Sequence, residues 1–229
     1  MSPIIFIVLP ILLFSVIIHE CAHGIAAYRC GDDTAKLMGR ITLNPIPHID
    51  PFWSIIIPLI MIISYKAGIF IPLIAGAKPI PVNPLNFKRP RRDDIIVSAA
   101  GISSNILLAI TAGLLLIAFV NFPMISIKVR AGFGIFFLYV VLINFWLATF
   151  NLIPLPPLDG SHILANVLPY TASKAFRQIN PLIGMIILIL LISSGLLGYI
   201  FLPILKVTLS FIDLVTSEAV LNEMSKFLK

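Results

Sequence analysis

The sequence predicts an all-α fold: a polytopic membrane helix bundle of about four to six membrane segments, with a re-entrant or short β element. Of the 229 residues, 59% are hydrophobic and 11% are charged, whereas a soluble domain carries about 25% charged residues. The mean hydropathy is +1.06. Several apolar runs are long enough to cross a bilayer as helix, which takes about 20 residues. We expect one membrane-embedded domain over residues 1–229.

The first apolar run, residues 3–18, is expected to continue as helix to about Ala27 and to end near Gly31. A signal peptide is the alternative, but the run lacks a basic start and a small-residue cleavage site. We therefore interpret it as the first membrane helix. If Cys21 and Cys30 both lie on this helix, they are about 13 Å apart along its axis, which is too far for a disulfide.

The later segments follow from the same criteria. Residues 36–51 are rich in proline and turn formers and are expected to form an ordered loop. Membrane helices are predicted over 95–120, 133–152 and 181–205, the last with a weak point at Ser193-Ser194-Gly195. The tail from Lys206 is amphipathic, which predicts a helix along the membrane surface.

The distribution of lysine and arginine predicts the orientation in the membrane. Residues 29–40 carry three and 78–92 carry five, whereas 121–132 carry two. The first two regions are therefore expected in the cytoplasm and the third outside, in the cell membrane. Residues 52–77 must then enter and leave on one side, and 26 residues cannot cross twice as helix. We favour a re-entrant element; a spanning helix over 52–72 is the alternative.

The net charge of +6 does not indicate nucleic-acid binding. The basic residues lie in loops between apolar runs, and no basic stripe is interleaved with exposed aromatic residues. The expected partners are the lipid bilayer and the substrate.

His19-Glu20-Cys21-Ala22-His23 is an H-E-x-x-H motif. Positions i and i+4 of a helix share a face, so His19 and His23 can bind one zinc ion, and Glu20 can act as general base on a metal-activated water. The alternative is a polar patch at a helix end without metal. Against it stands the cost of ionisable groups in an apolar helix, which usually mark function.

A catalytic zinc needs a third protein ligand. The best candidate is Asp159, in the run Asn151-Leu-Ile-Pro-Leu-Pro-Pro-Leu-Asp-Gly160. It follows a helix that runs toward the membrane face near which His19 and His23 lie. A helix N-cap is the alternative role for Asp159, and His162 is a weaker ligand candidate three residues on.

These two motifs together resemble the site-2 protease family of intramembrane zinc metalloproteases, and the resemblance is to its compact prokaryotic members. It implies the following roles: zinc ligation by His19, His23 and Asp159, catalysis by Glu20, and substrate binding beside the active site by Asn151. The stretch Ala99–Asn105 resembles a family A-G-P-x-x-N element, in which Ile102 replaces the proline.

Four polar residues keep two interpretations each. His48 and Asp50 could form a second polar group near the metal, although a turn with local hydrogen bonds is favoured. Asn105 and Asn144 lie in apolar helices, where either interhelical hydrogen bonding or substrate contact explains them.

We expect a zinc endopeptidase that hydrolyses peptide bonds of membrane-spanning protein or peptide substrates. Residues 69–82 could receive the unwound substrate as an added β-strand, and Asn151 could stabilise the oxyanion. The alternative is a non-proteolytic membrane zinc-binding protein or transporter. A transporter would carry polar or charged residues along several helices, but the helices predicted over 95–120 and 181–205 contain few of them. An inactive homologue would typically have lost Glu20 or a ligand.

Overall fold

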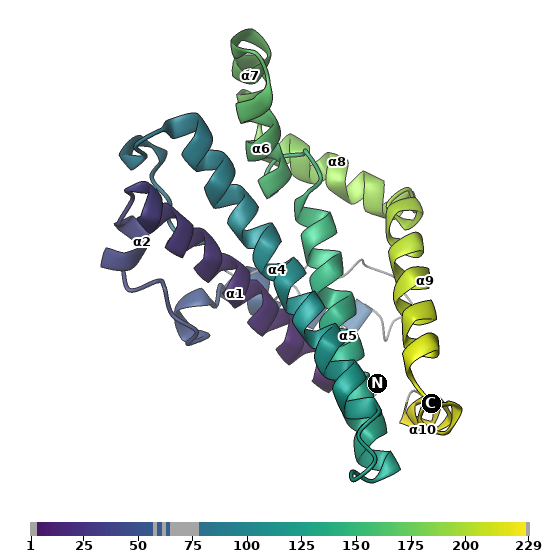
Figure 1. Ribbon diagram of the computed structural model, residues 1–229. Coiled ribbons are helices and arrows are strands. Elements are labelled where there is room, and N and C mark those ends of the chain that lie inside the picture. The colour runs from purple at the N-terminus through teal and green to yellow at the C-terminus, as the bar shows by residue number, and fades with distance from the viewer. Residues whose placement is uncertain (1–3, 57–58, 61–62, 65–77, 228–229) are drawn as a thin grey trace.

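The computed structural model describes residues 4–56, 59–60, 63–64 and 78–227, and it is 77% helical, with no strand among those residues (Figure 1). Four described helices are long and apolar enough to cross a membrane: α1 (Ile5–Cys30), α4 (Pro90–Val120), α5 (Ile127–Asn151) and α9 (Gly198–Val215). A bent pair, α7 (Tyr170–Arg177) with α8 (Pro181–Ser193), would make a fifth. The predicted all-α membrane bundle is confirmed.

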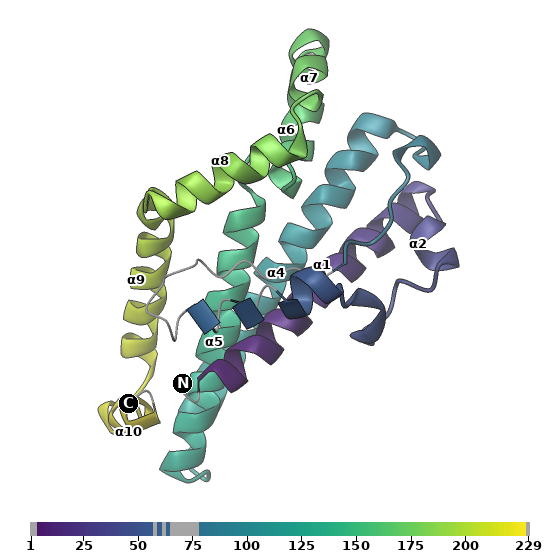
Figure 2. The ribbon, with the colours of Figure 1, turned by 180° about the vertical axis from the view of Figure 1, so that it is seen from behind.

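The central part of the bundle consists of α1, α4 and α5, with α4 packed against both of the others (Figures 1 and 2). The end of α1 and the start of α4 lie at the end of the bundle where α5 leads into α6 (Asp159–Val167) and α7. Small side chains on α4, such as Ala109 and Ala112, are buried and let neighbouring helices approach closely. This arrangement brings the carboxyl end of α1 and the segment after α5 together.

The first helix ends as predicted, and its end is joined to a distant loop. Gly31 adopts a φ of +112°, in which glycine is favoured, and its N–H caps the helix. The buried carboxylate of Asp32 accepts hydrogen bonds from Asn83 N (2.8 Å) and from Asn86 Nδ2 (2.8 Å). These contacts hold the segment around η3 (Pro84–Asn86) beside the end of α1.

The region between α1 and α4 is described in part. It contains α2 (Thr34–Leu37), a 3₁₀ turn η1 (Ile46–His48) and a π-helical turn η2 (Pro51–Ile56). Most of the predicted re-entrant element over 52–77 lies outside the described residues. The same holds for most of the predicted substrate edge, 69–82; its described end, 78–82, is not a strand.

The last apolar run, 181–205, divides at the weak point that the sequence indicated. α8 ends at Ser193 and α9 begins at Gly198, with Gly195 at a φ of +74° between them. Lys206 therefore lies inside α9 rather than starting the surface tail. The break follows the Ser-Ser-Gly sequence, since glycine adopts positive φ without steric cost.

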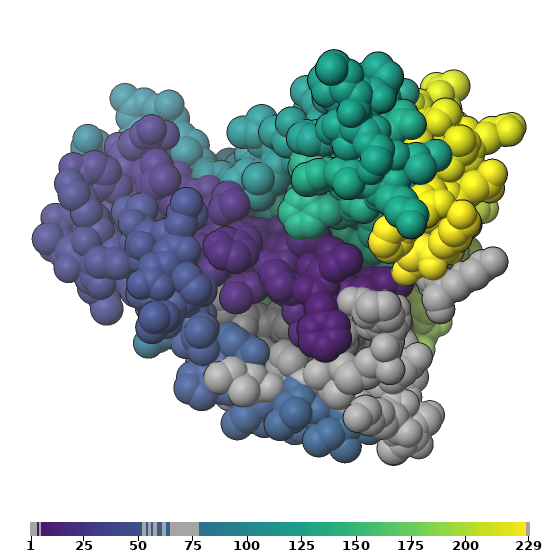
Figure 3. Space-filling model, turned by 90° about the horizontal axis from the view of Figure 1, so that it is seen from below, coloured from purple at the N-terminus to yellow at the C-terminus, as the bar shows by residue number. Residues whose placement is uncertain are grey.

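The amphipathic tail is α10 (Glu218–Phe227), and it packs against α5 (Figure 3). Val220 and Met224 are buried there with Leu116 and Val120 of α4. A Cβ at Gly134 of α5 would lie 3.0 Å from the Met224 sulfur and 3.1 Å from Val120. The absence of a side chain at this position thus allows α10 to cover the far end of the bundle.

Candidate metal centre

Three side chains from two distant segments converge inside the bundle. His19 and His23 lie one turn apart on α1, and Asp159 is the first residue of α6. The Nε2 atoms of the two histidines are 3.0 Å apart. Asp159 Oδ2 lies 3.1 Å from His19 Nε2 and 3.3 Å from His23 Nε2. In the described part of the chain these are the only three histidine, cysteine or acidic residues whose ligand atoms lie close enough to share a metal ion.

The hydrogen bonds made by the Nδ1 atom of each ring indicate whether the converging Nε2 atom carries a proton or a lone pair. His19 Nδ1 lies 2.6 Å from Asn105 Oδ1, and His23 Nδ1 lies 2.7 Å from the Val97 carbonyl oxygen. Both partners are acceptors, so each ring carries its proton on Nδ1 and presents a lone pair at Nε2. Asp159 Oδ2 is buried and receives no hydrogen bond. Three electron-pair donors therefore face one another.

This donor set fits a zinc ion. Two lone pairs and a carboxylate oxygen repel one another unless a cation lies among them. With ligand bonds of about 2.0–2.1 Å in tetrahedral geometry, neighbouring ligand atoms lie about 3.3 Å apart, close to the separations of 3.0, 3.1 and 3.3 Å found here. Two imidazoles and one carboxylate also leave a fourth position open, as catalytic zinc sites do.

Asn105 of α4 holds the His19 ring through a buried interhelical network. Its Nδ2 donates to Asn144 Oδ1 of α5 at 2.9 Å, and Asn144 Nδ2 donates to Ser15 Oγ of α1 at 2.9 Å. Because Asn144 Oδ1 accepts a hydrogen bond from Asn105 Nδ2, the Asn105 amide is oriented with its Oδ1 toward His19. The interhelical interpretation of Asn105 and Asn144 is confirmed, and Asn105 also contacts a predicted ligand directly.

Gly101 allows α4 to lie against both histidines. A Cβ at this position would lie 2.5 Å from His23 Nε2 and 2.6 Å from His19 Cε1. Real Cβ atoms essentially never approach so closely, so only glycine fits without displacing a ring. Sequence reasoning found the glycine through the A-G element but not its contact with the metal centre.

Asp159 is positioned by the start of α6 rather than serving as its cap. Leu158 is the N-cap, and a Cβ at Gly160 would lie 2.3 Å from the Leu152 carbonyl oxygen. The Asp-Gly pair therefore packs tightly against the end of α5. A metal ion bound among these three donors would hold the Asp159 carboxyl in its ionised form, because a ligating carboxylate must be deprotonated.

A second polar cluster anchors α6 to α4. Asp94 contacts His162 Nδ1 at 3.4 Å and Arg177 Nη2 at 3.5 Å, and it accepts a hydrogen bond from Asn166 Nδ2. The hydrogen bond to Asp94 raises the pKa of His162. His162 therefore pairs with Asp94 and does not join the three converging side chains. Sequence reasoning missed Asp94, Asn166 and Arg177; the acidic pair at 93–94 beside an apolar run was the available signal.

The remaining predicted residues lie around this centre. Glu20 follows His19 on α1, and its Oε2 accepts a hydrogen bond from Ile80 N at 2.7 Å. The segment carrying Ile80 is held by Arg40 Nη2, which donates to the Lys78 carbonyl oxygen at 2.9 Å. Asn151 Nδ2 donates to the Leu147 carbonyl oxygen of its own helix at 3.0 Å, and it is not among the three converging residues.

His48 and Asp50 form local contacts in the loop. His48 Nε2 donates to the Thr42 carbonyl oxygen at 2.9 Å, and Asp50 N donates to Ser54 Oγ at 3.0 Å. Neither residue belongs to the metal-ligating group among the described residues. The favoured interpretation, a turn with local hydrogen bonds, agrees with these contacts.

Comparison with known proteins gives consistent results. The model of Peptidase family M50 matches residues 6–128 and 121–192. The chain is 38% identical over 199 residues to a candidate zinc metalloprotease of Bacillus subtilis, YwhC, covering 85% of this chain and 84% of that protein. It is 28% identical over 192 residues to a Mycolicibacterium smegmatis protein similarly named, Rip2, covering 82% of this chain and 68% of that protein. No solved structure matches the chain significantly.

Proposed function

This chain belongs to peptidase family M50, the site-2 protease family of zinc metalloproteases, and from that premise we propose that it cuts membrane-spanning substrates with Glu20 as the general base. We further propose that His19, His23 and Asp159 hold the zinc. The observation that carries this proposal is the convergence of three electron-pair donors within 3.0–3.3 Å of one another. One of them, His19, directly precedes Glu20 in the chain.

A zinc ion bound there would supply Lewis-acid activation of water and of the scissile carbonyl. Glu20 accepts the proton of the attacking water and delivers it to the leaving amine. The Ile80 N–H holds one carboxylate oxygen of Glu20, which orients the other oxygen and limits the rotation of the side chain. The ionised Asp159 balances part of the charge of the metal ion. A helical substrate must unwind before its carbonyl can enter the site.

Asn151 is proposed to bind substrate or to stabilise the oxyanion. In this structure its amide nitrogen donates a hydrogen bond to the Leu147 carbonyl oxygen. The side chain must therefore rotate away from α5 before it can donate a hydrogen bond to substrate. The proposal rests on the family resemblance of the N-x-x-P-x-x-P-L-D-G run and on the position of Asn151 before Asp159 in the chain.

The test uses the purified full chain with a reporter membrane-helix substrate. Glu20→Gln keeps the size of the side chain but removes its proton-accepting charge, so cleavage is expected to fall about 10²- to 10⁴-fold. Bound zinc, measured by elemental analysis, is expected to stay near the wild-type level. A chelator should stop wild-type cleavage. Cleavage that persists in Glu20→Gln would contradict the role of Glu20, and zinc transport into vesicles without any cleavage would support the transporter alternative.

A further inference from the structure

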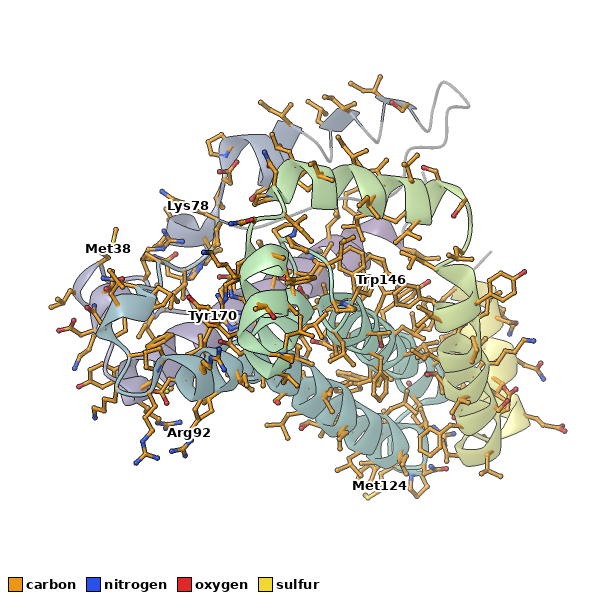
Figure 4. The ribbon with its side chains drawn as sticks, turned by 90° about the horizontal axis from the view of Figure 1, so that it is seen from above. Met38, Lys78, Arg92, Met124, Trp146 and Tyr170 are labelled. Atoms are coloured by element: carbon orange, nitrogen blue, oxygen red, sulfur yellow. The ribbon has the colours of Figure 1, made fainter. Side chains whose placement is uncertain are left out.

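A pocket of about 390 Å³ lies apart from the metal centre, at the end of the bundle where α4 begins. Arg91 of α4 lines one side, and residues of α7 and its carboxyl end line the other: Tyr170, Ser173, Lys174, Arg177 and Gln178. Figure 4 shows Tyr170 on α7 and Arg92 on the start of α4 at this end of the molecule. Three of the six lining residues are cationic and none is acidic, so the pocket is suited to an anion.

One cation of the pocket is held in place and two are available. Arg177 Nη2 donates to Asn166 Oδ1 at 2.7 Å and contacts Asp94 at 3.5 Å, which fixes the guanidinium at the pocket wall. Within the described residues, the exposed Arg91 and Lys174 make no ion pair with an acidic group. Ser173 is 6% exposed and lines the same pocket. Guanidinium, ammonium and hydroxyl donors together match the oxygens of a phosphate group.

The position of the pocket indicates where that phosphate comes from. Arg91 lies in the first turn of a membrane-spanning helix, which is where lipid headgroups meet the protein. The chain then bends by 82° between α7 and α8. The side chains of α8 are apolar and exposed, including Leu182 (65%), Ile186 (57%) and Leu190 (63%). The apolar helix α8 thus begins at Pro181, three residues after Gln178 of the basic pocket, and a phospholipid combines the same two features in its charged headgroup and apolar acyl chains.

We propose that this pocket binds the phosphate of an anionic phospholipid, whose acyl chains lie along α8. Basic pockets beside membrane helices are suited to such headgroups. Because Arg177 also contacts Asp94 and Asn166, the bound lipid would stabilise the contacts that anchor α6 to α4. The proposal stands on the pocket and its surroundings and does not depend on proteolytic activity.

The experiment measures lipid binding to the full chain in a neutral detergent by native mass spectrometry. Phosphatidylglycerol, phosphatidylcholine and inorganic phosphate are titrated separately. The test variant is Arg91→Gln/Lys174→Gln. The matched control, Arg29→Gln/Arg92→Gln, removes the same charge from exposed arginines at the same end that do not line the pocket. Lys174→Gln alone provides a milder change at an exposed side chain.

Phosphatidylglycerol is expected to bind the wild-type chain and the control with affinities that agree within about threefold. Each basic residue near an anionic headgroup contributes about fivefold, so Lys174→Gln should weaken binding about fivefold and the double pocket variant on the order of thirtyfold. Equal weakening in the pocket variant and the control would overturn the proposal in favour of general surface attraction. Equal binding of phosphatidylcholine, or displacement of the lipid by an equal concentration of inorganic phosphate, would overturn the assignment to an anionic lipid.

Discussion

At the scale of single residues, the proposed metal centre depends on groups that would not themselves contact the metal. Asn105 accepts the Nδ1 proton of His19, and the Val97 carbonyl accepts that of His23. Each of these partners selects the tautomer that leaves Nε2 free as a ligand. Asn105 is itself held by Asn144 and Ser15 from two other helices. Asn105, which orients the His19 ring, is therefore held in place by the protein as firmly as the ring itself.

Replacing Asn105 tests this role. Asn105→Ala removes the acceptor of the His19 Nδ1 proton, so zinc affinity is expected to fall about 10- to 100-fold, measured by competition with a chelator. Asn105→Asp keeps an acceptor oxygen and should restore most of the affinity. If Asn105 had only a structural role, Asn105→Asp should bind zinc more weakly than Asn105→Ala, because Asp adds a buried charge. Asn121→Ala, at the far end of α4, is the matched control and should bind zinc like the wild type.

At the scale of elements, the site depends on how closely α4 lies against α1. The two histidines and Gly101 occupy facing surfaces of these helices, and a methyl group at Gly101 would lie 2.5–2.6 Å from both rings. The same helix carries Gly113, where an added Cβ would find its nearest neighbour, Val141, at 3.9 Å. α4 therefore contains both a glycine that the site requires and one that it does not.

This pair gives a controlled experiment on helix packing. Gly101→Ala and Gly113→Ala increase intrinsic helix propensity by the same amount, about 1 kcal/mol. Only the first places a methyl group against the histidine rings, so Gly101→Ala is expected to lose most bound zinc while Gly113→Ala keeps it. Elemental analysis of the purified variants measures this directly. Normal zinc content in Gly101→Ala would mean that α4 lies farther from the α1 histidines than it does in this structure.

At the scale of the whole molecule, the basic residues gather at one end. The end of α1, the start of α4 and the pocket on α7 carry most of them, and the 121–126 turn lies at the other end (Figure 1). The preference of lysine and arginine for the cytoplasmic side predicts that the first end faces the cytoplasm. The metal centre lies toward this end, since Asp159 follows α5 there. We propose that the chain functions as one membrane-embedded domain with this orientation.

Two exposed positions at opposite ends test the orientation. Leu85 is 91% exposed near the start of α4, and Met124 is 87% exposed after its end. The native cysteines, Cys21 and Cys30, are buried and provide a low background. On intact cells a membrane-impermeant maleimide should label Met124→Cys at once and Leu85→Cys only after permeabilisation. Labelling in the reverse order would show that the basic end faces outward.

The sequence alone determined the features that depend on local geometry. The length of the apolar runs predicted membrane helices, and the i, i+4 spacing placed His19 and His23 on one face of α1, because helix periodicity fixes both. Gly31 marked the end of α1 because few other residues adopt positive φ. Asp159 was found through its motif and through the direction in which α5 runs.

Only the tertiary structure decided how distant segments meet. It placed His162 beside Asp94 rather than among the three converging side chains. It also brought the Ile80 N–H to the Glu20 carboxylate and Asn105 Oδ1 to the Nδ1 atom of His19. Finally, it formed the basic pocket between α4 and α7. Periodicity within a helix specifies which face is apolar but not which neighbour covers it. Those contacts depend on the path of the loops and on packing between helices, which no local pattern contains.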